Sequence, residues 1–378
     1  MTSITNSVLS CGAFWAINFV SVFLISAFCA GVVIPQILLI SFRKKLFDIP
    51  DERKIHQGVV PRLGGIAFKP VIFFAITLLM GCSELLGYEN LLSGIAYESR
   101  PLAFGFCTIM ILYLVGMADD LIGIRYKAKF IAQIICGLFM IGGGLWINSL
   151  HGIFFIDAIP EWIGYPLTLL AVVFIINAIN LIDGIDGLAS GLCGVAMFFY
   201  GILFIIVHKY IYAMIAFATL GVLVPFFYFN VFGDANKRKK IFMGDTGSLT
   251  VGMTICFLSF RLLLCFPAED LDNMPNAFIL AFSPLIIPCF DVVRVYLHRV
   301  RNGQNPFMPD KNHIHHKLLA IGMQQHTAMI TIITISVVFI TGNIFLSHYL
   351  DITLLLLLDI GIYTLGNLWL RHKIRSKQ

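Results

Sequence analysis

The amino-acid sequence predicts an all-α, polytopic integral membrane protein with about eleven transmembrane helices. Of the 378 residues, 58% are hydrophobic and only 12% are charged, and the mean hydropathy is +0.89. Soluble domains carry charged residues at about twice this frequency. Runs of about twenty apolar residues cross a bilayer as helices, and eleven such runs can be placed. No soluble segment of domain size remains, so we expect one membrane-embedded domain over residues 1–378.

The spans follow one another with short polar interruptions. The first, centred near Val20, has no Lys or Arg before Arg43 and is too long for the apolar part of a cleavable signal peptide. The runs near Phe198 and Phe217 are divided only around His208 and Lys209. Hydropathy centres the ten later spans near Phe74, Ile109, Leu138, Leu170, Phe198, Phe217, Cys256, Ile286, Val337 and Leu357.

Basic residues predict the orientation of the chain. The outer loops hold little beyond Arg100 and Lys209. The predicted inner loops hold Arg43, Lys44, Lys45, Arg53, Lys54, Arg62, Arg125, Lys127, Lys129, Lys237, Arg238, Lys239, Lys240, Arg299, Arg301, Lys311, Lys317, Arg371, Lys373, Arg375 and Lys377. Because basic loops stay in the cytoplasm, we expect the N-terminus outside and the C-terminus in the cytoplasm.

The formal charge of +5 has a simple explanation in this topology. Lysines such as Lys237 to Lys240 can fix the topology and contact anionic lipid head groups, or contribute to a site. We expect no nucleic-acid partner. The nine cysteines lie mostly inside spans without paired spacing, which indicates helix packing rather than disulfide or zinc chemistry.

Four polar motifs lie at the predicted inner ends of spans. The first is Asp119-Asp120, where adjacent carboxylates repel each other unless a cation or a proton separates them. Metal or acid–base chemistry would use this pair, whereas a solvated helix end needs no ligand. The second motif places polar side chains three residues apart, along one helical face, at Asn177, Asn180, Asp183 and Asp186.

The second motif contains more polar groups than a simple turn needs, and at membrane depth they must find donors, water or a substrate. The third motif, from Phe242 to Ser248, leads into the eighth span. A helix start favours anions and Asp245 can hold a metal, so the motif suits a diphosphate with its divalent cation. Thr246 and Ser248 equally suit simple N-caps.

The fourth motif contains three histidines in the longest inner loop, which Pro306 and Pro309 stiffen. Its spacing is not that of a zinc protease, and no cysteine accompanies it. With nearby basic residues the histidines suit hydrogen bonds to phosphate oxygens, while a pH sensor or a plain polar loop is the alternative. The residues concerned are Arg299, Arg301, Lys311, His313, His315 and His316.

Taken in order, the motifs resemble the polyprenyl-phosphate N-acetylhexosamine-1-phosphate transferase superfamily, from about Asp48 to Gly322. The segments 56–65 (HQGVVPRLGG) and 306–316 (PFMPDKNHIHH) are similar to the WecA/TagO branch. One departure concerns the first motif, which in this superfamily is often Asp-Asp-x-x-Asp. Here the fifth position is Gly123, so the resemblance carries over only Asp119 and Asp120.

The resemblance implies transfer of GlcNAc-1-phosphate from UDP-GlcNAc to undecaprenyl phosphate, with release of UMP, as the first step of cell-surface polysaccharide synthesis such as that of O-antigen. It implies a bacterial cytoplasmic (inner) membrane location with the site facing the cytosol. It also implies Mg²⁺, with Mn²⁺ as a substitute, contact with membrane lipid, and a homodimer.

Individual roles follow from this resemblance. Asp245 is expected to be the principal Mg²⁺ ligand, Asp119 to orient or deprotonate the lipid phosphate, and Asp120 to support it; all three are assigned to catalysis and the metal. The uridine and ribose end is assigned to Asn180, Asp183 and Asp186, with Phe242 as a stacking surface. The diphosphate is assigned to Lys127, Arg299, His313, His315 and His316.

Two alternatives remain open. The first is the same chemistry with another donor, such as UDP-MurNAc-pentapeptide or UDP-GalNAc, because sugar choice depends on a few hydrogen bonds from the inner loops. The second is a secondary transporter, which also carries intramembrane carboxylates. Its charges would lie near the middle of the bilayer in two similar halves, and no internal duplication is visible in the sequence.

Overall fold

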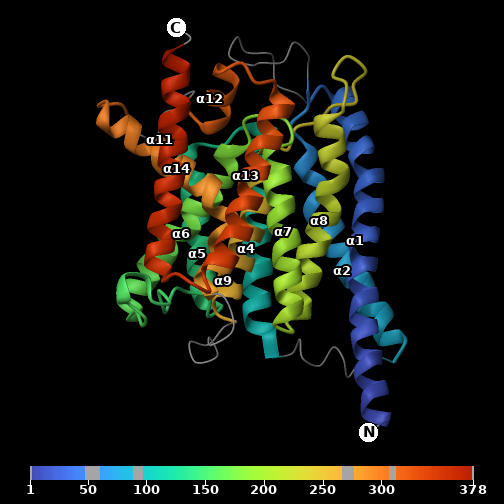
Figure 1. Ribbon diagram of the computed structural model, residues 1–378. Helices are drawn as coiled ribbons and strands as arrows, with labels where there is room; N and C mark the ends of the chain where they lie inside the picture. Colours follow the sequence, from blue (N-terminus) through green and yellow to red (C-terminus); the bar gives the residue numbers. More distant parts are fainter. Residues whose placement is uncertain (1, 47–59, 88–96, 266–275, 306–311, 377–378) are drawn as a thin grey trace.

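The computed structural model describes residues 2–46, 60–87, 97–265, 276–305 and 312–376, which form a helical bundle without a named strand (Figure 1). The long helices are α1 (Thr2–Lys44), α2 (Phe68–Leu85), α4 (Ser99–Ile122), α5 (Tyr126–Gly142), α6 (Glu161–Ile182), α7 (Leu188–Ile206), α8 (Tyr210–Val231), α9 (Gly244–Leu263), α11 (Ile286–Arg301), α13 (Gln325–Leu346) and α14 (Ile352–Arg375). The short ones are η1 (Gly64–Ala67), η3 (Ile153–Phe155), α10 (Ala277–Phe282), η5 (Ser283–Leu285) and α12 (Ile314–Ala320).

The predicted all-α transmembrane fold is confirmed. Each of the eleven predicted centres lies in a helix, and ten of the described helical segments are long and apolar enough to cross a membrane. The remaining helix, α5, has only 17 residues, which makes it about 25 Å long. The two termini lie at opposite ends of the bundle (Figure 1). Opposite termini require an odd number of crossings, so α5 completes the path as the eleventh.

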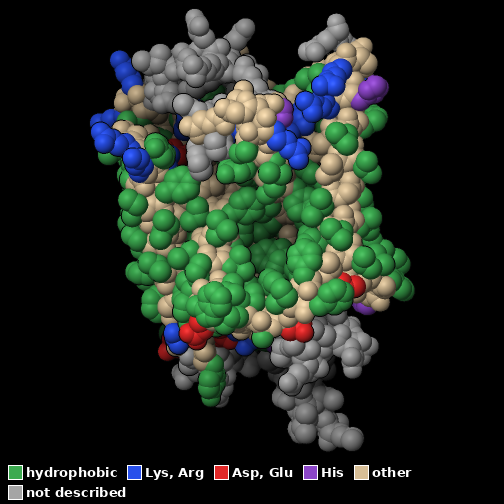
Figure 2. Space-filling model, turned by 90° about the vertical axis from the view of Figure 1, so that its left-hand side faces the viewer, with side chains coloured by type: hydrophobic (Ala, Val, Ile, Leu, Met, Phe, Trp, Pro, Cys, Tyr) green, Lys and Arg blue, Asp and Glu red, His purple; other side chains and the backbone are tan. Residues whose placement is uncertain are grey.

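The two ends of the bundle differ in charge. We call the end that carries the C-terminus the upper end and the opposite one the lower end, as drawn in Figure 1. On the face shown in Figure 2, apolar side chains form a band around the middle of the molecule. Lys and Arg side chains gather above this band, and most Asp and Glu side chains lie below it.

Helix α9 forms the centre of the bundle. All its residues from Thr246 to Phe260 are buried, and α4, α6, α7 and α10 pack around it. Hydroxyl groups in the middle of the helix are satisfied within it; for example, Thr254 and Ser259 donate to carbonyl oxygens four residues earlier, both at 2.8 Å. A helix enclosed on all sides has its position fixed by packing. Asp245, in the first turn of α9, is therefore held in place by the core.

The segment before α2 is tied to the segment before α9. The backbone N–H groups of Gly64 and Gly65 donate to the carbonyl oxygens of Phe242 and Met243 at 3.0 Å each. The N–H of Phe242 in turn donates to Pro61 O at 2.9 Å. These bonds satisfy backbone groups that packing would otherwise leave unpaired, and they close the upper end of the bundle around the start of α9.

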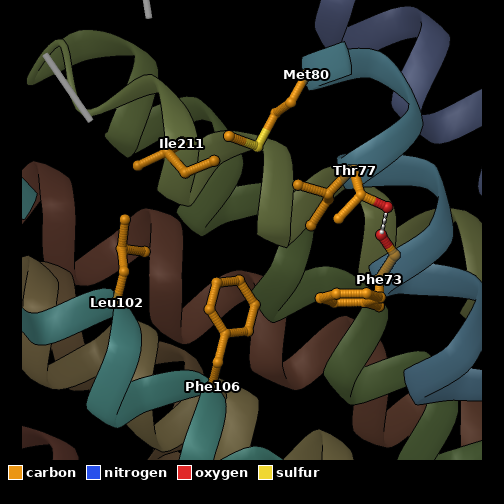
Figure 3. A pocket seen from close by; sticks show the side chains of 7 residues that line it. Phe73, Thr77, Met80, Leu102, Phe106 and Ile211 are labelled. Atoms are coloured by element: carbon orange, nitrogen blue, oxygen red, sulfur yellow. Dashed lines mark hydrogen bonds between the residues drawn. The ribbon is translucent and has the colours of Figure 1, made fainter. Parts of the chain in front are cut away.

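A small cavity of about 110 Å³ lies between α2, α4 and α8 (Figure 3). Its walls include Phe73, Met80 and Phe106, and its one hydroxyl, that of Thr77, donates to Phe73 O at 2.8 Å. Leu102 and Ile211 place it near the lower ends of α4 and α8. The cavity is thus apolar and lies away from the polar motifs.

Candidate active site

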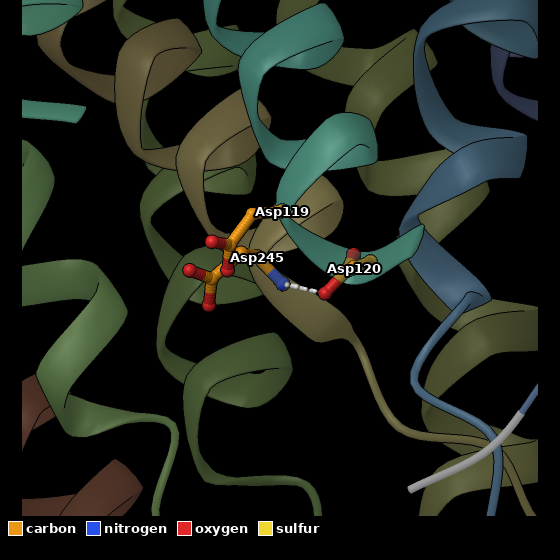
Figure 4. A group of neighbouring side chains, drawn as sticks. All are labelled: Asp119, Asp120 and Asp245. Carbon is orange, nitrogen blue, oxygen red and sulfur yellow. Dashed lines mark hydrogen bonds between the residues drawn. The ribbon is translucent and has the colours of Figure 1, made fainter. Parts of the chain in front are cut away.

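Three carboxylates meet at the upper end of the bundle. Asp119 and Asp120 lie in the last turn of α4, and Asp245 lies in the first turn of α9. Each offers one oxygen atom within 4.8 Å of the others. Figure 4 shows the carboxylates of Asp119 and Asp245 side by side, with Asp120 turned toward the backbone of α9. The predicted meeting of the first and third motifs is therefore present in the structure.

Lys129, in the first turn of α5, lies between two of these carboxylates. Its Nζ donates to Asp119 Oδ2 at 2.6 Å and forms a shorter ion pair with Asp245. Lys127, which the resemblance assigns to the diphosphate, is exposed. Residues two apart on a helix point in nearly opposite directions. Only one of the two lysines can face α4 and α9, and helical periodicity from Tyr126 cannot say which one.

Asp120 is occupied with the N-terminus of α9. Its Oδ1 accepts from the N–H of Asp245 at 2.8 Å, and its Oδ2 accepts from the N–H of Thr246 at 2.8 Å and the hydroxyl of Thr246 at 2.5 Å. These are the free N–H groups of a helix start, for which a carboxylate is a favourable partner. Asp120 thus fixes Asp245. Asp119 and Asp245 each accept two hydrogen bonds against three for Asp120, so they have more capacity for a ligand.

Gly123, at the departure from the superfamily pattern, ends α4. It has φ +72°, a conformation that favours glycine, and its N–H donates to Asp119 O at 2.8 Å. The next N–H, of Ile124, donates to Asp119 Oδ1 at 2.7 Å. The turn after α4 therefore holds the Asp119 side chain in place.

Asn180 lies beside Asp245. Its amide donates to Asp245 Oδ1 at 3.2 Å and to the hydroxyl of Ser248 at 2.8 Å. The resemblance assigns Asn180 to the uridine and ribose end of the donor, but the structure places the Asn180 amide in the carboxylate cluster. Asn177, one turn earlier, bonds to Gln133 and to its own helix, so it joins α5 to α6.

Asp183 and Asp186, in the same motif, have different surroundings. Asp183 is accessible to solvent, but protein surrounds it closely. Desolvation, followed by the negative charges of Asp186 and Asp245, raises the pKa of Asp183 to about 7. Asp186 is buried and forms an ion pair with Lys240 at 2.6 Å. Asp183 is therefore the member of this motif with a carboxyl group open to a ligand.

The histidine motif packs against the same loop. His315 is only 1% exposed, and a Cβ on Gly184 would lie 2.2 Å from its Nε2, so only glycine fits there. Among the residues that the structure describes, neither ring nitrogen of His315 has a hydrogen-bond partner. Burial, followed by the charges of His316 and His313, lowers its pKa to about 3. The His315 ring is thus held neutral against the Asp183 loop.

The other residues of the motif lie around His315. Its ring stacks on that of His313, with centroids 5.8 Å apart, and lies 4.2 Å from that of His316. Arg299, at the end of α11, is 8% exposed. Phe242 is partly buried, and its backbone is hydrogen-bonded to the segment before α2. Pro306, Pro309 and Lys311 lie outside the described residues.

Sequence reasoning missed Asp291, which binds His313. Its carboxylate is fully buried in α11, and His313 Nδ1 lies 2.8 Å from its Oδ2. The signal was available, because a carboxylate inside an apolar span indicates a partner or a function. The prediction instead treated this run as membrane-spanning sequence alone.

The carboxylate cluster has the composition of a site for a hard divalent cation. Asp119 and Asp245 share one ammonium group, Lys129, and Asp120 lies beside them, so the described residues bring more carboxylates than ion-paired ammonium groups to this point. Carboxylate oxygens are the ligands that Mg²⁺ prefers in proteins. Asp119 and Asp245 are the pair with free ligand capacity, so the residues present fit such an ion.

Clustered carboxylates at the end of a transmembrane bundle mark a functional site in a polytopic membrane protein. The model of the family described as glycosyl transferase family 4 matches residues 102–263, which contain Asp119, Asp120 and Asp245. The chain belongs to this family of membrane transferases, and the predicted resemblance to the polyprenyl-phosphate N-acetylhexosamine-1-phosphate transferases is confirmed.

Curated relatives cover most of the chain. A probable undecaprenyl-phosphate N-acetylglucosaminyl 1-phosphate transferase of Bacillus subtilis is 31% identical over 85% of this chain and 83% of its own length. Undecaprenyl-phosphate alpha-N-acetylglucosaminyl 1-phosphate transferases of Salmonella typhi and Escherichia coli K12 are 32% and 30% identical. They match 79% and 76% of this chain, and 75% and 72% of their own lengths.

Proposed function

We propose that this protein transfers GlcNAc-1-phosphate from UDP-GlcNAc to undecaprenyl phosphate and releases UMP. The observation that carries the proposal is the pair of facing carboxylates, Asp119 and Asp245, at the ends of transmembrane helices. The names of the relatives support both the acceptor and the sugar. At the ends of the transmembrane helices, a lipid phosphate in the membrane and a water-soluble nucleotide sugar can meet.

Bond changes are simple in this reaction. An oxygen of the lipid phosphate attacks the β-phosphorus of the donor, the bond from that phosphorus to the bridging oxygen breaks, and UMP leaves. Phosphoryl transfer of this kind asks the protein for positioning and charge neutralisation. We favour direct displacement, because side-by-side binding of both substrates requires no covalent enzyme intermediate.

Asp119 and Asp245 would hold Mg²⁺, or Mn²⁺ in its place. The bound ion would neutralise charge on the diphosphate and on the leaving UMP. Lys129 balances part of the carboxylate charge and stands close enough to contact a phosphate oxygen. Asp119 orients the acceptor phosphate, which is largely dianionic at neutral pH and needs little help to lose a proton. Asp120 holds α9 and thereby Asp245.

The donor extends from the cluster toward the histidine motif. Asp183 is the carboxylate with solvent access on this path, and we assign it to the nucleotide. Arg299, His313 and His316 supply donors for phosphate oxygens. His315, buried against Gly184, joins the motif to the Asp183 loop. Asp186 acts through its ion pair with Lys240 rather than by touching the donor.

We further propose that the upper end faces the cytosol, in the inner membrane of a bacterium. The basic residues near the described helix ends support this orientation, because Lys and Arg gather at the upper end in Figure 2. A homodimer, contact with lipid and a role as the first step of surface polysaccharide synthesis are carried over from the superfamily. Initiation of a polymer requires that the lipid-linked product be a substrate for a later glycosyl transfer.

An exchange assay tests the proposal. Because one phosphoanhydride replaces another, the equilibrium constant lies near one and UMP reverses the reaction. Purified protein should transfer radiolabelled UMP into UDP-GlcNAc only when undecaprenyl diphosphate-linked GlcNAc and Mg²⁺ are present. If folded protein shows no exchange with UDP-GlcNAc but does with UDP-GalNAc or UDP-MurNAc-pentapeptide, the proposed reaction type stands and the proposed donor is wrong. No exchange with any of these donors would contradict the proposal.

A further inference from the structure

A single carboxylate, Asp291, connects three helices behind the histidine motif. It lies in α11 and accepts hydrogen bonds from α12 and α14 as well as from its own helix. Its exposed fraction is 0%. A buried carboxylate of this kind is costly unless donors satisfy it, so the arrangement around it must meet that requirement.

Four donors surround the Asp291 carboxylate. Oδ1 accepts from Arg294 at 2.8 Å, from the backbone N–H of Ile314 at 3.0 Å and from the Tyr363 hydroxyl at 3.1 Å. Oδ2 pairs with His313 Nδ1 at 2.8 Å. An ionised carboxylate has about four lone-pair sites. Because Asp291 is fully buried and both of its oxygens are bound to protein donors, any effect on chemistry must pass through its partners.

These bonds fix three consecutive residues of the motif. Arg294 also donates to the carbonyl oxygen of Asn312, Asp291 binds the ring of His313, and the N–H of Ile314 donates to the same carboxylate. The backbone before and after His313 is thus held from α11 together with its side chain. One residue of a loop is rarely anchored at three successive points unless its orientation matters.

The bond to Asp291 also determines which nitrogen of His313 faces a ligand. An ionised carboxylate only accepts, so Nδ1 must carry a proton. Nε2 is left for another partner, and it has none in the part of the chain that the structure describes. The His313 ring stacks on His315, which packs against Gly184. His313 is therefore next to the loop that carries Asp183.

We propose that Asp291 is a positioning residue for the transfer reaction, which holds Nδ1–H of His313 so that the N–H at Nε2 of the protonated ring donates to the donor diphosphate. This inference rests on the proposed function. Carboxylates that orient a histidine ligand of a metal change activity by about 10- to 100-fold when removed, and we expect a loss of the same order for a carboxylate that orients a histidine toward a phosphate. A carboxylate that only joins α11, α12 and α14 would change stability and leave His313 chemistry intact.

The first experiment is a double-mutant cycle in nanodiscs. Asp291→Asn should lower kcat by about 10- to 100-fold in the wild-type background and by less than about threefold when His313→Asn is already present. Tyr363→Phe removes one bond to the same carboxylate but not the bond to His313, and it should keep kcat within about threefold of wild type. Thermal unfolding of each variant is measured alongside.

Equal losses from Asp291→Asn in both backgrounds would show that Asp291 does not act through His313 and would overturn the proposal. So would a wild-type kcat in folded Asp291→Asn. If that variant does not fold, ¹⁵N-histidine spectra of the wild-type protein decide the question. The His313 signal, assigned by its loss in His313→Asn, should report a proton on Nδ1, and on Nε2 as well when UDP-GlcNAc is bound; an Nδ1 without a proton, or an Nε2 without one in the complex, would contradict the inference.

The same preparations separate this inference from the proposed function. If the wild-type protein performs UMP exchange but the double-mutant cycle is additive, only the proposed role of Asp291 is contradicted. If the wild-type protein is folded and carries a proton on Nδ1 of His313 but catalyses no exchange with any UDP-sugar, the proposed function is contradicted while the Asp291–His313 pair stands.

Discussion

Helices α4 and α9 carry a charged cluster at each end, and the two clusters are built in opposite ways. At the upper end Asp119 and Asp245 share one lysine, Lys129, with Asp120 beside them. At the lower end one carboxylate, Glu98, accepts from two cations, Lys209 and Arg261, and from the hydroxyl of Tyr212. Two cations share one carboxylate in the lower cluster, whereas two carboxylates share one cation in the upper one, so only the upper cluster is suited to bind a further cation.

Exposure differs in the same direction. The side chains of Asp119 and Asp245 are 17% and 28% exposed, against 9% for Glu98. Buried, fully paired charges hold elements together, while partly exposed and unbalanced ones bind ligands. The difference indicates that one cluster holds α4 and α9 together and the other is the site of chemistry. The predictions below compare them.

The largest effect is expected for Asp245→Asn. Loss of one of the two facing carboxylates should lower kcat by more than about 100-fold without unfolding the protein, because an amide is a poor ligand for Mg²⁺ and leaves less charge to hold it. The measurement is UMP exchange together with thermal unfolding. A folded variant that keeps more than about a tenth of the rate would remove Asp245 from the metal role.

Next in size is Lys129→Met. Without its ammonium group the carboxylate pair loses its balancing charge, so we expect a loss of kcat of about 10- to 100-fold and tighter binding of Mn²⁺ in the absence of substrate. Mn²⁺ binding can be followed by electron paramagnetic resonance. Lys127→Met is the matched comparison and should lose less than about threefold, since Lys127 is exposed. A larger loss for Lys127→Met than for Lys129→Met would support the assignment of Lys127 to the diphosphate.

A smaller effect concerns pH. The pKa of Asp183 is raised to about 7 by desolvation and by the charges of Asp186 and Asp245, so the carboxylate form grows as the pH rises through this value. If that form accepts hydrogen bonds from the nucleotide, KM for the donor should fall from about pH 6 to about pH 8. Asp183→Asn should raise KM by about threefold to tenfold and flatten the profile. An unchanged profile in this variant would exclude Asp183.

The smallest effect on turnover is expected for Glu98→Gln, in the lower cluster. Kcat should stay within about twofold, while the free energy of unfolding falls by about 1–3 kcal/mol because two cations lose their shared partner. Burial alone would raise the pKa of Glu98, but Lys209, Arg261 and Tyr212 lower it overall. Its contribution to stability is therefore present above the ordinary pKa of a glutamate and is lost as the pH falls through the lowered value. Loss of kcat without loss of stability would contradict the comparison.

The features that depend on local sequence could be predicted, and those that depend on helix rotation could not. Apolar run length located all eleven spans, and the alternation of loops brought Asp119 and Asp245 to the same end. Which of Lys127 and Lys129 faces the cluster depends on how α5 packs against α4 and α6. In the same way, Asn180 turns to Asp245 and Asp186 to Lys240 because of tertiary contacts that the spacing of the motif does not contain.

The short helix α5 has a consequence for the surrounding bilayer. Its 17 residues reach about 25 Å, against a hydrocarbon core of about 30 Å. A span shorter than the hydrocarbon core is accommodated by local thinning of the bilayer or by flanking side chains that extend to the interface, and thinning would draw the head-group layer toward Lys129 in the first turn of α5. We expect turnover in reconstituted vesicles to be faster in short-chain than in long-chain phosphatidylcholine, so that hydrophobic mismatch becomes a means by which membrane thickness controls delivery of a lipid phosphate.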